Sequence, residues 1–107
     1  VLGLQGPCLA VETACSASLV ALHVAARAMR QRECETHVAA GVNIILQPSS
    51  SHGFAAAGMI SAAGRSHTFD SRADGFARGE GCCAVMLRAD ESRQARQLSG
   101  SSVRQDG

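Results

Sequence analysis

The chain has 107 residues, of which 46% are hydrophobic and 18% charged, with a formal net charge of +1. A chain of this length accommodates one small domain. The near-neutral charge gives no basic surface for nucleic acid, and the absence of Tyr and Trp removes platforms for stacking bases. No apolar run approaches the roughly 18 residues of a membrane span. We therefore expect neither nucleic acid nor a membrane as a partner.

The charged fraction is below the roughly 25% of an average globular protein, which suits a piece of a larger core better than a free-standing domain. The sequence starts at Val1 without Met, and we expect both ends to lie inside a longer polypeptide. Five cysteines with no CxxC pair predict free thiols in a reducing compartment rather than disulfides or a zinc site. A cytoplasmic location is expected, or a plastid if a transit peptide precedes the chain.

The first half of the chain predicts a short buried strand followed by a helix. The strand is expected at residues 8–13. Residues 18–32 predict the helix, because they contain good helix formers and neither Gly nor Pro. Apolar residues cover most of the circumference in its first half, which predicts burial on nearly all sides.

The second half predicts further strands separated by connections. A core strand is expected at residues 38–45, followed by an irregular connection at 47–67 with a short helix at 53–58. A loop is expected at 69–81, a third buried strand at 82–87 and a fourth strand at 98–103. Alternation of strands with a buried helix predicts a layered α/β fold.

The junction between the first expected strand and the helix carries Cys15. A side chain at a helix N-terminus lies beside N–H groups with partial positive charge, which stabilise a thiolate. The same N–H groups can bind the oxyanion formed when a thioester carbonyl is attacked. The small neighbours Ala14, Ser16 and Ala17 allow a sharp turn, as at the nucleophilic serine of α/β-hydrolases. The pattern favours Cys15 as a nucleophile.

Two other interpretations of Cys15 stay open from the residues alone. It could be a small buried residue, as many free cysteines are, or the nucleophile of a thiol protease, although the papain-type signature is missing. His23 would lie about 80° around the helix and roughly 12 Å along it from Cys15, so it is no convincing partner. The other histidines lie in or near connections: His37, His52 and His67. The other cysteines lack such a junction and are interpreted as structural: Cys8, Cys34, Cys82 and Cys83.

Residues 70–81 have the composition of a metal site. As a calcium loop, however, the segment has Arg72 at the third position and Gly81 where a bidentate Glu is needed. As a phosphate-binding P-loop, it lacks the Gly-Lys-Ser/Thr ending. We expect turns held by Asx bonds and Arg–carboxylate pairs, and no bound metal.

Two long blocks of sequence stand out in order along the chain. The first is GPCLAVETACSASLVALH at residues 6–23, around the cysteine. The second consists of TFD, ADGF and RGEGC at residues 68–70, 73–76 and 78–82. Together they resemble modular polyketide ketosynthases, which are β-ketoacyl synthases. Between the blocks GVN at residues 41–43 fits a family strand, and QDG at 105–107 fits the family's next landmark, so the resemblance covers nearly the whole chain.

The resemblance implies a thiolase-like layered αβαβα fold that works as a homodimer. Residues 1–107 would be an internal segment of one ketosynthase domain, with acyltransferase and other synthase domains in the same polypeptide. Cys15 would accept an acyl group from the phosphopantetheine thioester of an acyl carrier protein, with no cofactor bound directly. A malonyl-type extender would then be decarboxylated and condensed with that acyl group. The Cys15 N–H would form half of the oxyanion hole, and Glu80 matches a family glutamate with a supporting role.

The departures from the family pattern leave the cysteine unchanged. They are Glu12 where Asp is usual, Ala17 for Ser, Arg104 for Asn, an unusual stretch at 50–57 and a short polar stretch at 89–100. The block around Cys15 favours a polyketide over a fatty-acid synthase. A non-elongating or structural dimer partner is the alternative, against which the retained cysteine argues. We expect the isolated chain to be inactive and poorly folded, because its helix lacks enough partner surface.

Overall fold

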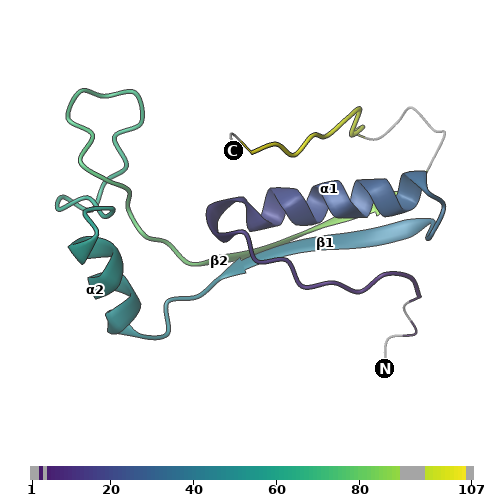
Figure 1. The fold of residues 1–107 in the computed structure, drawn as a ribbon, viewed down its shortest axis with the longest axis horizontal. Helices are drawn as coiled ribbons and strands as arrows, with labels where there is room; N and C mark the ends of the chain where they lie inside the picture. The colour runs from purple at the N-terminus through teal and green to yellow at the C-terminus, as the bar shows by residue number, and fades with distance from the viewer. Residues whose placement is uncertain (1–2, 4, 90–95, 106–107) are drawn as a thin grey trace. The chain divides into compact units, whose positions relative to one another are not determined.

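The computed structural model describes residue 3 and residues 5–89 and 96–105. In chain order it contains a short 3-10 helix η1 (Ala14–Ser16), helix α1 (Ala17–Arg30), strand β1 (Thr36–Asn43), helix α2 (Pro48–Ala56) and strand β2 (Gly81–Arg88) (Figure 1). The chain divides into two compact units. The first comprises residues 1–41 and 82–107, and the second comprises residues 42–81.

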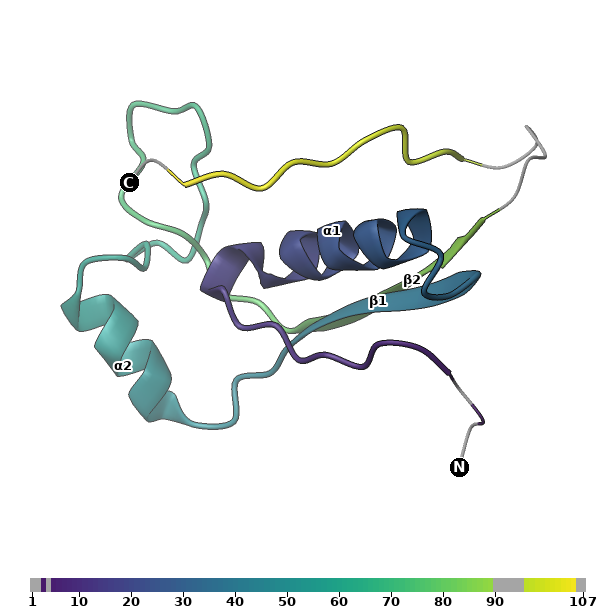
Figure 2. The same cartoon turned by 45° about the vertical axis from the view of Figure 1, so that its right-hand side comes forward.

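The first unit is built on the two-stranded sheet of β1 and β2. The strands are antiparallel, because the Ala89 N–H, just after β2, donates to the Glu35 carbonyl, just before β1, at 3.0 Å. Helix α1 lies along this sheet, and residues 96–105 run along the opposite side of the helix (Figures 1 and 2). The helix that follows Cys15 is therefore layered between the sheet and an extended segment.

Helix α1 begins one residue before the predicted start at 18 and ends two residues before the predicted end at 32. It ends in a Schellman motif, in which Arg32 adopts a φ of 60° and the Glu33 N–H donates to the Ala28 carbonyl at 3.0 Å. The predicted burial on nearly all sides is wrong for this structure. Its buried residues are the alanines at 25, 26 and 28, whereas Leu19 is 71% exposed. Two strands and one extended segment offer too little surface to cover a whole helix.

Both strands of the sheet fall where the sequence predicts them, but they are not buried as expected. Ala39 is buried on β1, whereas Val85 and Met86 on β2 are 46% and 69% exposed. Side chains of a strand point alternately to the two faces of the sheet, and helix α1 covers only one face of this two-stranded sheet. The large side chains on the other face therefore stay exposed.

The strands expected at residues 8–13 and 98–103 are not formed. Both segments are extended without a strand assignment, and Leu9 is 67% exposed. A strand requires a hydrogen-bonded neighbour, and neither segment pairs with one in the described part of the chain. Residues 90–95, within the short polar stretch, and 106–107, at the end of the family landmark, lie outside the described residues.

The second unit contains α2 and the long loop that follows it. The helix begins five residues before the expected start of 53, because Pro48 occupies its first turn, where the missing N–H is harmless and the fixed φ is favourable. The stretch at 50–57 that departs from the family pattern is therefore largely helical. The loop expected at 69–81 is confirmed, with an isolated bridge between Ile60 and Phe76. In the described residues, no helix is long and apolar enough to cross a membrane.

Candidate active site at the start of α1

The chain turns sharply immediately before Cys15. Ala14 has a φ of 53°, in the left-handed region that side-chain-bearing residues rarely adopt. Local strain of this kind is concentrated at functional sites. The small side chain of alanine limits the steric penalty, as the sequence predicts for the neighbours of Cys15.

Local hydrogen bonds hold this turn. The Glu12 carboxylate accepts the Ala14 N–H at 2.9 Å. The Ser16 hydroxyl donates to the Thr13 carbonyl at 3.0 Å and lies 2.9 Å from the Thr13 hydroxyl. In the sequence Glu12 is only a mild departure from the family pattern, but in the structure its carboxylate caps the turn before Cys15.

Cys15 lies in η1, which leads directly into the 14 residues of α1. The Ala17 N–H bonds back to the Ala14 carbonyl, so the turn and the helix are continuous. The Cys15 side chain is exposed and forms no disulfide. An accessible thiol at the N-terminal end of a long helix has the geometry of a nucleophile beside the positive end of the helix dipole.

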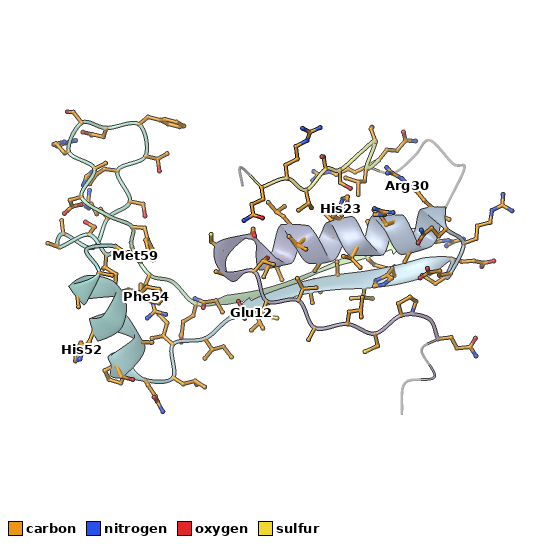
Figure 3. All side chains as sticks on the ribbon, viewed as in Figure 1. Glu12, His23, Arg30, His52, Phe54 and Met59 are labelled. Atoms are coloured by element: carbon orange, nitrogen blue, oxygen red, sulfur yellow. The ribbon has the colours of Figure 1, made fainter. Side chains whose placement is uncertain are left out.

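The histidines of the described residues do not form a hydrogen bond with Cys15. His23 Nδ1 lies 2.9 Å from Ser101 Oγ, and His37 Nδ1 lies 3.2 Å from the Val38 carbonyl. Figure 3 shows His23 and Arg30 on the side of α1 that faces residues 96–105. The His23 bond thus joins α1 to the extended segment, a contact that the sequence did not indicate.

A shallow hollow of about 380 Å³ lies along the same side of α1. It is bordered by Ser16 and Leu19 on the helix and by Val103 and Arg104 on the extended segment. Its lining begins one residue after Cys15, so this hollow adjoins the start of α1.

Glu80 belongs to the second unit, where its contact is with the backbone. Its Oε1 accepts the Ile45 N–H at 2.6 Å. The Asn43 side-chain amide donates to the neighbouring Gly79 carbonyl. These two bonds join the end of β1 and the segment that follows it to the residues just before β2, so the contact of Glu80 is a structural one.

Arg78 anchors the loop to α2. Its Nη1 donates to the hydroxyls of Ser50 and Ser51, both at 3.0 Å. Its guanidinium carbon lies 4.9 Å from the centre of the Phe54 ring, a cation–π geometry. The Phe54 and Phe76 rings meet edge to face, with centroids 6.3 Å apart. Sequence patterns did not indicate this anchor, because they show only an arginine in a Gly-rich loop.

The acidic residues of the loop are used in turns, as the sequence predicts. Asp70 pairs with Arg72 at 2.6 Å, and this hydrogen-bonded pair lowers the pKa of Asp70. A side-chain hydrogen bond with Ser61 lowers the pKa of Asp74, whose Oδ2 also accepts the Ala62 N–H at 3.2 Å. Throughout the described ranges, no group of three or more His, Cys, Asp or Glu side chains could hold a metal ion.

The sequence matches the family described as beta-ketoacyl synthase, N-terminal domain, over residues 1–93. The chain belongs to this family. One of the phenolphthiocerol/phthiocerol polyketide synthase proteins of Mycobacterium tuberculosis is 45% identical over 99% of this chain. A mycocerosic acid synthase-like polyketide synthase of Mycolicibacterium smegmatis is 41% identical over 99% of it.

Solved ketosynthase structures share the fold. The oxazolomycin ketosynthase domain of Streptomyces albus superimposes with a TM-score of 0.76 and 43% identity, over 78% of this chain and 15% of that domain. The ketosynthase from module 6 of the Bacillus subtilis bacillaene synthase gives a TM-score of 0.72 and 39% identity, over 74% of this chain and 14% of the other. These matches confirm the expected thiolase-like α/β fold class.

The chain spans a small part of each relative. It covers 6% of the Mycobacterium tuberculosis protein and 5% of the Mycolicibacterium smegmatis protein. Resemblance to polyketide synthases, expected from the blocks at residues 6–23 and 68–82, is confirmed.

Proposed function

We propose that residues 1–107 are part of a single polyketide-type ketosynthase domain and carry its nucleophile, Cys15. The observation that carries this proposal is an exposed thiol at the N-terminal end of α1, behind a left-handed turn at Ala14. Family membership and the similarity to polyketide synthases support it, and they favour polyketide over fatty-acid synthesis.

The first reaction is acyl transfer to Cys15. The thiolate attacks the carbonyl of an acyl thioester carried on the phosphopantetheine arm of an acyl carrier protein. A new carbon–sulfur bond to Cys15 forms, and the bond to the carrier sulfur breaks, so the carrier leaves as a thiolate that takes up the proton Cys15 gave up. The Cys15 backbone N–H supplies one donor of the oxyanion hole during this step.

The second reaction is decarboxylative condensation. A malonyl-type extender on a carrier protein loses carbon dioxide, and the resulting carbanion attacks the acyl-Cys15 carbonyl. A carbon–carbon bond forms, the carbon–sulfur bond to Cys15 breaks, and the product is a β-ketoacyl chain two carbons longer on the carrier. Glu80 keeps the supporting role that the family resemblance implies, and within its own unit its carboxylate holds the Ile45 backbone.

The partners follow from this chemistry. The acyl carrier protein presents both substrates, and acyltransferase and other synthase domains share its polypeptide. The ketosynthase acts as a homodimer in the cytoplasm. The 107-residue chain by itself is inactive, because the large apolar residues of α1 and β2 are exposed in it, with Leu19 at 71% and Met86 at 69%.

The test is acyl loading of the complete ketosynthase domain with a radiolabelled acyl thioester. The wild-type domain is expected to carry the label on the peptide that contains Cys15, and Cys15→Ala to carry none. Cys83→Ala, which removes an exposed thiol on β2, is the matched control and is expected to load normally. Equal labelling of wild type and Cys15→Ala would refute the assignment.

A further inference from the structure

The first turn of α1 approaches β1 at a residue that has no side chain. An ideal Cβ on Gly41 would lie 2.2 Å from Ser18 Oγ and 3.0 Å from Ser18 Cβ. The hydroxyl could rotate away, but the Ser18 Cβ is fixed to the helix backbone. A side chain at position 41 would therefore displace the beginning of α1 or the strand beneath it.

Ser18 is close to Cys15 along the chain. The two residues are three positions apart, which is less than one turn of a helix. The turn at Thr13–Ser16 continues into α1 through the bond from the Ala17 N–H to the Ala14 carbonyl. A displacement of Ser18 is thus transmitted directly to the residue that carries the thiol.

We propose that the contact between Gly41 and Ser18 positions Cys15 for acyl transfer. Gly41 is a positioning residue, because it acts through Ser18 and α1 rather than by touching the reacting atoms. The inference rests on the proposed role of Cys15 as the acylated nucleophile. The contact adds a second support to the turn, since the bond accepted by Glu12 and the bond donated by Ser16 fix only its local shape.

The expected effect follows from the size of the displacement. Ordinary van der Waals contact begins at about 3.4 Å, so Ser18 Cβ must retreat by several tenths of an ångström from a new methyl group. Misplacement of a reacting group by about 1 Å can reduce a rate by roughly 10²-fold. A loss of about 10- to 100-fold in the rate of acyl loading is expected.

The experiment compares Gly41→Ala with wild type in the complete ketosynthase domain. The expected result is a fall of about 10- to 100-fold in kcat for acyl loading of Cys15, with KM for the acyl thioester changed by less than about threefold. Gly53→Ala is the matched control, because a Cβ at Gly53 has nothing within 4 Å. Its loading is expected to stay within about twofold of wild type.

A second substitution that makes room for the added methyl group tests the contact directly. Ser18→Gly removes the two atoms closest to a methyl group on residue 41 and leaves the Ser18 Cα at an ordinary contact distance of 3.9 Å. The double variant Gly41→Ala/Ser18→Gly is expected to load within about threefold of Ser18→Gly alone, because the two changes are coupled. A wild-type kcat for Gly41→Ala, or a loss that Ser18→Gly does not relieve, would overturn the proposal.

Alkylation by iodoacetamide separates this inference from the proposed function. In Gly41→Ala we expect the alkylation rate of Cys15 to change at least about threefold, while Cys34, which lies beyond the opposite end of α1, reacts at its wild-type rate. That result would stand even if the wild-type domain accepted no acyl group. An unchanged Cys15 rate, or an equal change at both cysteines, would show that Gly41 does not act by positioning Cys15.

Discussion

The turn before Cys15 and the loop before Glu80 are both irregular, but they are held in different ways. Hydrogen bonds between residues two or three apart hold the Cys15 turn. The loop depends on partners far away in the sequence: Arg78 bonds to Ser50, 28 positions away, and Glu80 to Ile45, 35 positions away. The turn before Cys15 can therefore be encoded within a few consecutive residues, whereas the loop requires its whole unit to be folded.

The greatest loss of stability should follow Gly75→Ala in the loop. Gly75 has a φ of 141°, and an added Cβ would lie 2.5 Å from the Ile60 carbonyl carbon and the Ser61 nitrogen. Because both atoms belong to the backbone, no rotamer change relieves the contact. We expect a loss of at least about 3 kcal/mol in the free energy of unfolding, measured by urea denaturation of the complete domain.

Gly79→Ala is the control for that prediction, because nothing lies within 4 Å of its added Cβ. It should change the free energy of unfolding by less than about 1 kcal/mol. Equal stability of Gly75→Ala and wild type would show that the loop is not constrained at Gly75.

A smaller loss is expected from Arg78→Met. The change removes two hydrogen bonds to serine hydroxyls and the contact with the Phe54 ring, which together contribute about 2 kcal/mol. Urea denaturation is the measurement. Arg88→Met on β2 provides an exposed arginine as control and should have little effect. If both variants lose the same stability, the anchor on α2 makes no specific contribution.

Glu12→Ala should destabilise the turn before Cys15 by about 1 kcal/mol, because the Ala14 N–H loses its acceptor. The expected consequence is a fall of about fivefold in acyl loading of Cys15, without a comparable loss of domain stability. Glu12→Gln keeps an oxygen at that place and should retain most of the loading rate. A loading rate unaffected by Glu12→Ala would mean that Ser16 alone holds the turn.

The smallest expected effect is on the stability of the folded domain at low pH. The pKa values of Asp70 and Asp74 are lowered in the folded chain, by Arg72 and by Ser61 respectively. Their stabilisation is fully present above the unfolded carboxyl pKa of about 3.9 and is lost as the pH falls through the lower folded values. Asp74→Asn should therefore flatten the decline of the urea midpoint below about pH 4. An unchanged pH profile would show that Asp74 contributes nothing to acid stability.

The regular elements could be predicted from the sequence because local patterns determine them. The apolar helix formers of α1 and the short apolar runs of β1 and β2 fell within a few residues of their observed places. Cys15 could be recognised as a candidate because the small residues around it and the following helix are local signals. Its position at the start of α1 was expected, and its role in acyl transfer stays a prediction.

The remaining features depend on contacts between distant residues, which composition cannot reveal. The backbone bond of Glu80, the anchor of Arg78 and the bond between His23 and Ser101 all join residues at least 27 positions apart. Burial was overestimated for α1 and β2 because apolar patterns report what a helix or strand can bury. They do not report how much partner surface this chain supplies.

The antiparallel pairing of β1 and β2 brings the two ends of the second unit close together, so that related domains could exchange it. Residues 42–81 leave the sheet at the end of one strand and return at the start of its neighbour, so this unit has adjacent ends. Segments with adjacent ends tolerate replacement well, because the rest of the fold need not rearrange to connect them. The whole unit could be exchanged between related synthases by recombination at two neighbouring points, with the cysteine and its helix inherited unchanged.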